Sequence, residues 1–179
     1  MSTIQSVETR HCDAGWRNYH FVRVETDDGT VGWSEFDENL GATGITTVVE
    51  DMAETVVGEP VEAIGRVRAK LVPRVRQSYT GVGAMAVGAI ENALLDAKAK
   101  EMGVRCVDLL GGAVREEIPV YWSHCGTYRI GGSRSEYYGD PVETLDDVVA
   151  LGEEVRDSQF GALKTNIFDF RGEEPTPWR

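Results

Sequence analysis

Residues 81–112, GVGAMAVGAIENALLDAKAKEMGVRCVDLLGG, decide the fold of this chain. They combine an alanine-rich helical pattern with a stop at Gly103 and a short apolar turn that ends at Gly111 and Gly112. The apolar stripe consists of Ala86, Ala89, Ile90, Ala93, Leu94 and Ala97. Because small side chains let another element approach closely, the pattern predicts a central helix rather than a peripheral one.

Upstream of this helix, the sequence predicts three strands and two further helices. Residues 3–10, residues 19–26 and Val31–Phe36 carry the aromatic and β-branched residues typical of strands. Apolar residues then recur at helical spacing over residues 45–56 and again over residues 61–75. The expected fold is therefore α+β, a three-stranded antiparallel meander plus a three-helix bundle.

The pattern changes downstream of Gly112. The run IPVYW at residues 118–122 resembles a buried strand, residues 144–158 have helical spacing, and ALKTNIF at residues 162–168 is a second strand candidate. A strand, a helix and a strand suggest a parallel βαβ unit. We expect no further element in residues 169–179. Because a single βαβ unit cannot cover both faces of a parallel sheet, we expect it to begin a domain that the sequence does not finish.

Composition excludes several classes of function. The 179 residues have a net charge of −12, which disfavours binding to nucleic acid or to an anionic membrane through a general basic field. The three cysteines have long and unrelated spacings, so neither a disulfide framework nor a metal motif is indicated. There is no signal-peptide pattern and no run of about 18 apolar residues, and we expect a cytoplasmic protein.

The meander with its three helices, the block GAIENALLDAKAKEMGVRCVDLLGG and the run IPVYWS closely resemble the mandelate racemase and muconate lactonizing enzyme branch of the enolase superfamily. The resemblance covers nearly the whole chain. It implies a capping domain at residues 1–117, followed at residues 118–179 by the first βαβ unit of a truncated (β/α) barrel, since a whole barrel needs about 200 residues or more. It also implies a homo-oligomer when the protein is full length.

The chemistry that the resemblance implies is abstraction of a proton α to a carboxylate, with Mg²⁺ holding the enediolate. Family members bind this ion with acidic side chains at the ends of the third, fourth and fifth barrel strands. Those ligands lie beyond residue 179, so no metal ligand is expected within this chain. The implied partner is a small carboxylate, with acid sugars favoured.

Lys164 and Asn166 are the predicted catalytic residues, because ALKTNIF matches the second barrel strand, where many relatives carry Lys-x-Lys. Alternation along a strand would place both residues on one face. Lys164 would bind the substrate carboxylate, and Asn166 would donate to a hydroxyl or to the developing enolate. Asparagine cannot accept a proton, which argues against two-base racemisation and favours an acid-sugar dehydratase. A surface or salt-bridged lysine is the structural alternative for Lys164.

Three further residues are predicted to bind substrate. In this family two loops of the cap close over the barrel mouth, and by position they correspond to residues 12–19 and 37–44. Trp16 and Tyr19 would shape the pocket, although they could equally pack the cap onto the barrel. His124 follows the first barrel strand at the rim where barrel enzymes gather functional groups.

Two other groups of residues are less typical of a functional site. Cys125 beside His124 invites a nucleophile-and-base interpretation, but adjacent residues on an extended chain point to opposite faces. Asp169, Glu173 and Glu174 are better interpreted as loop carboxylates than as metal ligands. A racemase or cycloisomerase of the same family, and a stand-alone cap-like binding domain, remain the alternative functions.

Overall fold

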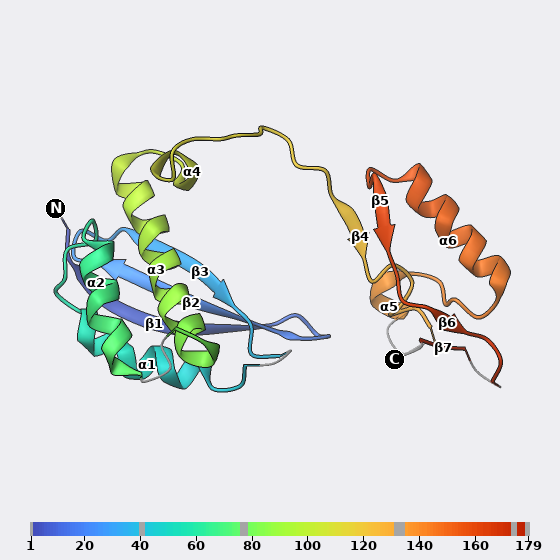
Figure 1. Ribbon diagram of the computed structural model, residues 1–179, viewed down its shortest axis with the longest axis horizontal. Helices are drawn as coiled ribbons and strands as arrows, with labels where there is room; N and C mark the ends of the chain where they lie inside the picture. The colour runs from blue at the N-terminus through green and yellow to red at the C-terminus, as the bar shows by residue number, and fades with distance from the viewer. Residues whose placement is uncertain (1, 40–41, 76–78, 131–134, 173–174, 178–179) are drawn as a thin grey trace. The chain divides into compact units, whose positions relative to one another are not determined.

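The computed structural model describes residues 2–39, 42–75, 79–130, 135–172 and 175–177 (Figure 1). The chain divides into two compact units, Met1–Ala113 and Val114–Arg179, and each is described by itself. The predicted domain boundary after residue 117 lies near this division and stays a prediction. No helix in the described ranges is long and apolar enough to cross a membrane.

The first unit contains the predicted meander. Strands β1 (Ile4–Asp13), β2 (Asn18–Thr26) and β3 (Val31–Phe36) form an antiparallel sheet in that order. Every second residue of β2 is buried, from His20 to Thr26, as expected for a sheet with one covered face. The prediction of a three-stranded antiparallel sheet is confirmed.

Four α-helices and one short 3₁₀ turn follow the sheet. They are α1 (Ile45–Val56), α2 (Ile64–Leu71), the 3₁₀ turn η1 (Val72–Arg74), α3 (Gly81–Met102) and α4 (Cys106–Leu109). Helices α1, α2 and α3 share one core with the sheet. The helix expected over residues 61–75 is shorter than predicted, because Pro73 lacks a backbone N–H and the chain tightens into η1 there.

Helix α3 lies unusually close to β3, which explains its alanine stripe. A Cβ atom added to Gly32 would lie 2.1 Å from the carbonyl oxygen of Ala93 and 2.8 Å from the Cβ of Ala97. The hydroxyl of Ser34 donates to the carbonyl oxygen of Ala89 over 2.6 Å. The prediction of a central, closely packed helix is confirmed, and the helix ends at Gly103 with φ 66°.

The hairpin between β1 and β2 is longer than the sequence indicates. The strands predicted at residues 3–10 and 19–26 leave residues 11–18 as their connecting loop, yet Cys12 pairs with Tyr19 and Asp13 pairs with Asn18. Only residues 14–17 remain outside the strands, and Gly15 adopts φ 81° in the turn. Ladder hydrogen bonds therefore extend strand structure into polar residues that carry no alternating pattern.

The second unit contains the predicted parallel pair, β4 (Tyr121–Ser123) and β5 (Ala162–Lys164). Helices α5 (Ser135–Tyr138) and α6 (Leu145–Asp157) lie between these strands in the chain. Strands β6 (Phe168–Asp169) and β7 (Thr176–Pro177) form a separate antiparallel pair. Among the described residues, the buried hydrophobic core of this unit consists of Cys125, Ile130, Val142, Leu151 and Val155.

Three expectations for this unit are wrong. The run at residues 118–122 is not a buried strand, because Ile118 is 76% exposed and nothing in the two-stranded sheet covers it. Strand β5 ends at Lys164, since the β4 chain turns away at His124 and leaves no further backbone to pair with. Residues 169–179, expected to hold no element, contribute to β6 and β7.

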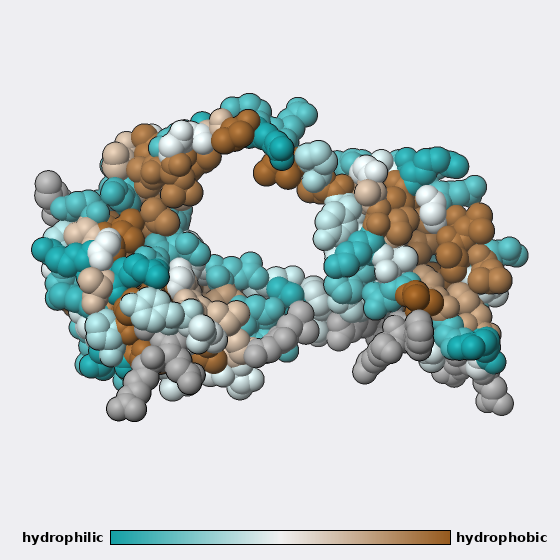
Figure 2. Space-filling model, viewed as in Figure 1, coloured by the Kyte–Doolittle hydropathy of each residue, from teal (hydrophilic) through white to brown (hydrophobic). Residues whose placement is uncertain are grey.

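Hydrophobic side chains also gather on the surface of the second unit (Figure 2). Leu163 of β5 is exposed, as are Leu145 and Val149 of α6. The last two are one helical turn apart and lie on one face of the helix. Strand β5 and helix α6 therefore leave apolar surface in contact with solvent.

Candidate functional site

Three hydrogen bonds join the segment after β4 to the end of β5. The backbone N–H of Cys125 donates to the carbonyl oxygen of Lys164 over 2.9 Å. The Thr165 hydroxyl donates to the carbonyl oxygen of Cys125 over 2.6 Å, and the Thr127 hydroxyl donates to Oδ1 of Asn166 over 3.2 Å. Both predicted catalytic residues are therefore held at the carboxyl end of this parallel pair.

Lys164 and Asn166 are both exposed. Within the described ranges, no hydrogen bond or ion pair engages the Lys164 ammonium group, so the salt-bridged alternative has no support there. Asn166 lies in the loop after β5 rather than on the strand, so strand alternation does not place it beside Lys164. The two side chains offer hydrogen-bond donors at one end of the sheet.

His124 occupies a strained position directly after β4. Its φ is 53°, in the left-handed region that residues other than glycine rarely adopt. Nδ1 of its ring lies 3.0 Å from the hydroxyl oxygen of Ser123, and the ring centroid lies 5.8 Å from that of Tyr128. The backbone turn at His124 exposes its imidazole at the strand end, where the sequence places it.

Cys125 is buried beneath the same turn, unlike exposed His124. Burial raises the pKa of its thiol, an effect that the nearby Arg129 guanidinium only partly offsets. A raised pKa keeps the sulfur protonated and makes it a poor nucleophile near neutral pH. The nucleophile-and-base interpretation of this Cys-His pair is therefore unsupported.

Arg129 anchors the segment after β4 to helix α6. Its guanidinium donates to both carboxylate oxygens of Glu154, over 2.7 and 2.9 Å, and lies 5.2 Å from the centre of the Trp122 ring. Arg129 is only 7% exposed. Sequence reasoning missed this pair because the two residues are far apart in the chain and share no local pattern.

The Arg129–Glu154 pair predicts a pH dependence for the second unit. The hydrogen bond from Arg129 lowers the pKa of Glu154, so the pair's contribution is complete above the unfolded pKa of about 4.3 and is lost as pH falls through the lower folded pKa. We expect Glu154→Gln to unfold at lower urea concentration than wild type at pH 7 and to lose less stability on acidification. Trp122 fluorescence monitors this in a background where the other three tryptophans are replaced with phenylalanine. Glu153→Gln, at the exposed neighbouring position, is the matched control, and its stability should match that of wild type at pH 7 and after acidification.

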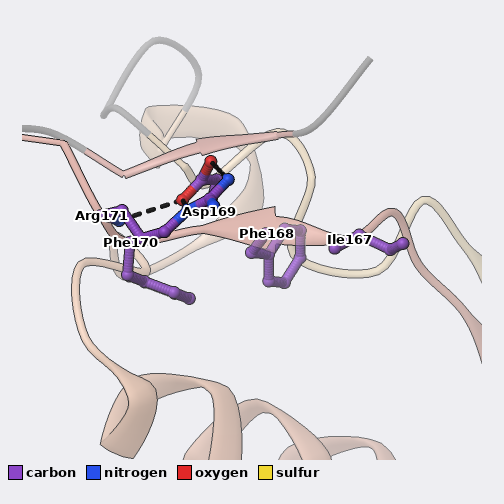
Figure 3. Close-up of a pocket in the computed structure, with 5 residues that line it drawn as sticks. All are labelled: Ile167, Phe168, Asp169, Phe170 and Arg171. Atoms are coloured by element: carbon purple, nitrogen blue, oxygen red, sulfur yellow. Dashed lines mark hydrogen bonds and ion pairs between the residues drawn. The ribbon is translucent and has the colours of Figure 1, made fainter.

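A shallow pocket follows Asn166 in the chain. It is lined by residues 167–171, and Figure 3 shows the Asp169–Arg171 pair on one side of β6 and the rings of Phe168 and Phe170 on the other. Arg171 donates to both carboxylate oxygens of Asp169 and lowers its pKa to about 2. The carboxylate of Asp169 is thus engaged by an arginine, and the residue lies in β6 rather than in the expected loop. Glu173 and Glu174 lie outside the described residues.

The tip of the β1–β2 hairpin brings together the cap residues that were predicted to bind substrate. The Arg17 guanidinium lies 5.1 Å from the ring centre of Trp16 and 4.1 Å from that of Tyr19. The two rings meet edge to face, with centroids 6.2 Å apart, and Arg17 pairs with Glu35 of β3 over 3.4 Å. Cation–π contacts of this kind hold aromatic side chains in a defined orientation.

The second predicted loop, residues 37–44, contacts this hairpin. The side-chain amide of Asn39 donates to the carbonyl oxygen of Asn18 over 2.6 Å, and a Glu38 carboxylate oxygen accepts from the Thr46 N–H over 2.6 Å. Burial raises the pKa of Glu38, but the hydrogen bonds from Thr46 and the nearby His20 outweigh it and leave the pKa lowered. The two loops are therefore connected within the first unit, although residues 40 and 41 lie outside the described part.

The described residues do not fit a magnesium site. No group of three or more His, Cys, Asp or Glu side chains among them could hold a metal ion. The one acidic side chain in the pocket, Asp169, already binds Arg171. No catalytic step in this chain is assigned to a metal.

Comparison with known proteins identifies the family. The sequence model of the mandelate racemase / muconate lactonizing enzyme N-terminal domain matches residues 5–111, which include the meander and helices α1 to α4. The chain belongs to this branch of the enolase superfamily. The first unit is accordingly the capping domain of an enolase-superfamily protein, and the parallel β4–β5 pair follows it.

Relatives differ in the reactions that their names describe. The chain is 32% identical to D-galactonate dehydratase of Xanthomonas euvesicatoria over 83% of its own length and 36% of the relative. It is 33% identical to D-gluconate dehydratase of Thermoproteus tenax over 94% of its length and 33% of the relative.

A solved structure from Burkholderia xenovorans LB400, provisionally named an L-alanine-DL-glutamate epimerase and bound to magnesium and fumarate, is 49% identical. It superposes with a TM-score of 0.92 over 99% of this chain and 44% of that one. The chain thus spans between a third and a half of the length of these relatives.

Proposed function

We propose that this chain supplies the capping domain and first barrel strands of an enzyme that abstracts a proton α to a carboxylate, and that its reaction is dehydration of an acid sugar. The observation that carries the proposal is the exposed Lys164 ammonium at the end of β5, which has no partner among the described residues, followed two positions later by an asparagine. In this assignment Lys164 binds the substrate carboxylate and Asn166 donates to an oxygen of the substrate.

The residue at position 166 supports dehydration over racemisation. Racemisation of the two-base type needs a proton acceptor on each face of the substrate, and a second lysine close to the first would have a lowered pKa and could serve as one. An asparagine amide cannot accept a proton. Two relatives named as acid-sugar dehydratases agree with this interpretation.

The remaining site residues complete the proposal. In the first unit, Trp16 and Tyr19, oriented by Arg17, are assigned to substrate binding. In the second unit, His124 is assigned to substrate binding as a polar group in the turn after β4. A second candidate is epimerisation of a dipeptide, which is favoured by the name of the 49%-identical structure. The two reactions differ in product and in hydrogen exchange.

The test uses the complete protein, meaning the full reading frame that contains these residues, in a magnesium-containing buffer. We expect it to convert an acid sugar such as D-galactonate or D-gluconate into a keto acid, measured as the semicarbazone. Deuterium exchange at the α carbon of L-alanyl-L-glutamate without turnover of any acid sugar would contradict the proposal and support the epimerase. The 179-residue chain alone is the control and should turn over neither compound, because its described residues hold no metal cluster.

A further inference from the structure

The orientation of the Asn166 amide is fixed by a residue from another segment. An asparagine side chain can present either its carbonyl oxygen, an acceptor, or its NH₂ group, a donor pair, and the two ends have nearly the same shape. The hydroxyl of Thr127, in the turn after β4, donates to Oδ1 of Asn166 over 3.2 Å. This bond uses one of the two lone pairs of Oδ1 and favours the orientation in which the NH₂ group points away from Thr127, where it can donate to a ligand.

We propose that Thr127 is a positioning residue that makes Asn166 a hydrogen-bond donor, so that this site selects a substrate with an oxygen acceptor, a hydroxyl or carboxylate, over one with an ammonium group. The inference rests on the proposed function, and it adds a residue and a basis for substrate selection. An ammonium group needs an acceptor, whereas the NH₂ group of Asn166 can only donate and one lone pair of its amide oxygen is already engaged by Thr127.

The neighbouring charges favour the same substrate class. Lys164 places at the end of β5 an ammonium group that has no partner in the described part of the chain, and this charge would repel a second cation. The next acidic residue after Asn166 in the chain is Asp169, and Arg171 donates two hydrogen bonds to its carboxylate. Lys164 and Asn166 therefore present donors, and the adjoining acidic group is already neutralised by an arginine.

The segment that carries Thr127 is itself restrained. The N–H of Thr127 donates to the carbonyl oxygen of His124 over 2.9 Å, and two residues further on Arg129 is anchored to Glu154. A Cβ atom on Gly126, where φ is 73°, would lie 2.5 Å from a Leu151 side-chain carbon. The turn is therefore tightly packed, which lets a single hydroxyl hold the Asn166 amide in one orientation.

The test combines three variants of the complete protein with a double-mutant cycle. Thr127→Val removes the hydroxyl at nearly constant shape and should lower kcat/KM for the acid sugar about tenfold, whereas Thr127→Ser should stay within about twofold of wild type. In an Asn166→Ala background, Thr127→Val should have almost no further effect. Thr176→Val removes an exposed hydroxyl of β7 that makes no hydrogen bond among the described residues, and it is the matched control. Equal losses in Thr127→Val and Thr176→Val, or an undiminished loss in the Asn166→Ala background, would refute the positioning role.

A second measurement does not depend on turnover. In nuclear magnetic resonance spectra of the 179-residue chain, Thr127→Val should shift the side-chain amide signals of Asn166 and speed their exchange with water, while Thr176→Val should change them far less. Unchanged Asn166 amide signals in Thr127→Val would overturn the inference even if acid sugars are turned over. Shifted signals in a complete protein that acts on no acid sugar would uphold the positioning contact and reject the proposed function instead.

Discussion

Replacing Gly32 with alanine is expected to destabilise the first unit by about 3 kcal/mol, at the upper end of the usual cost of overpacking. The new Cβ would lie 2.1 Å from the carbonyl oxygen of Ala93 and 2.7 Å from the backbone nitrogen of Ala97. Both atoms belong to the helix backbone, which cannot rotate away as a side chain can. Strand β3 and helix α3 would have to separate, and the Ser34 bond to the α3 backbone would be lost with their contact.

Urea unfolding followed by circular dichroism measures this change, and Gly88→Ala is its matched control. Gly88 lies in α3 with no other heavy atom within 4 Å of an added Cβ, so alanine there should stabilise the helix by about 0.5–1 kcal/mol. Opposite signs for the two glycine-to-alanine changes are the expected result. If Gly32→Ala unfolds at the same urea concentration as wild type, the close approach of β3 and α3 is wrong.

The same contact shows which part of the fold could be predicted from the sequence. The alanine stripe and Gly103 are local signals, since helical periodicity and a left-handed stop depend on neighbouring residues in the chain. They identified α3 and its end correctly. The partner of the stripe, Gly32, carries no signal of its own, because a glycine in a strand is equally compatible with a bulge or a turn.

Expectations failed where structure depends on pairing between distant segments. The apolar run at residues 118–122 is typical of a buried strand, but burial requires covering elements that a two-stranded sheet lacks. Cys12 and Asp13 look like loop residues, yet ladder pairing with β2 makes them strand. A local pattern indicates what a segment can form, and the available partners decide what it does form.

The same contrast between local patterns and distant contacts applies to the candidate site. Lys164, Asn166 and His124 could be named from the sequence, because they lie at or just after the ends of strands that the family resemblance identifies. The contacts that orient them could not, since Thr127 reaches Asn166 across 39 positions in the chain and Arg129 reaches Glu154 across 25. Side-chain hydrogen bonds over such separations leave no periodic trace, so the groups that set the geometry of the site were found only in the folded chain.

Lys164→Met in the complete protein is expected to lower kcat/KM for its carboxylate substrate by about 10²–10³, the usual effect of removing one donor to a developing negative charge. Its melting temperature should stay close to that of wild type, because the Lys164 side chain is exposed and has no partner in the described ranges. Lys164→Arg, which keeps the positive charge, should recover part of the activity. Lys98→Met removes a lysine of α3 whose only described bond is a long one of 3.4 Å, and it should leave kcat/KM within about twofold of wild type. Activity retained in Lys164→Met would show that this lysine is a surface residue and that the substrate carboxylate is bound elsewhere, whereas a parallel fall in melting temperature would assign it a structural role.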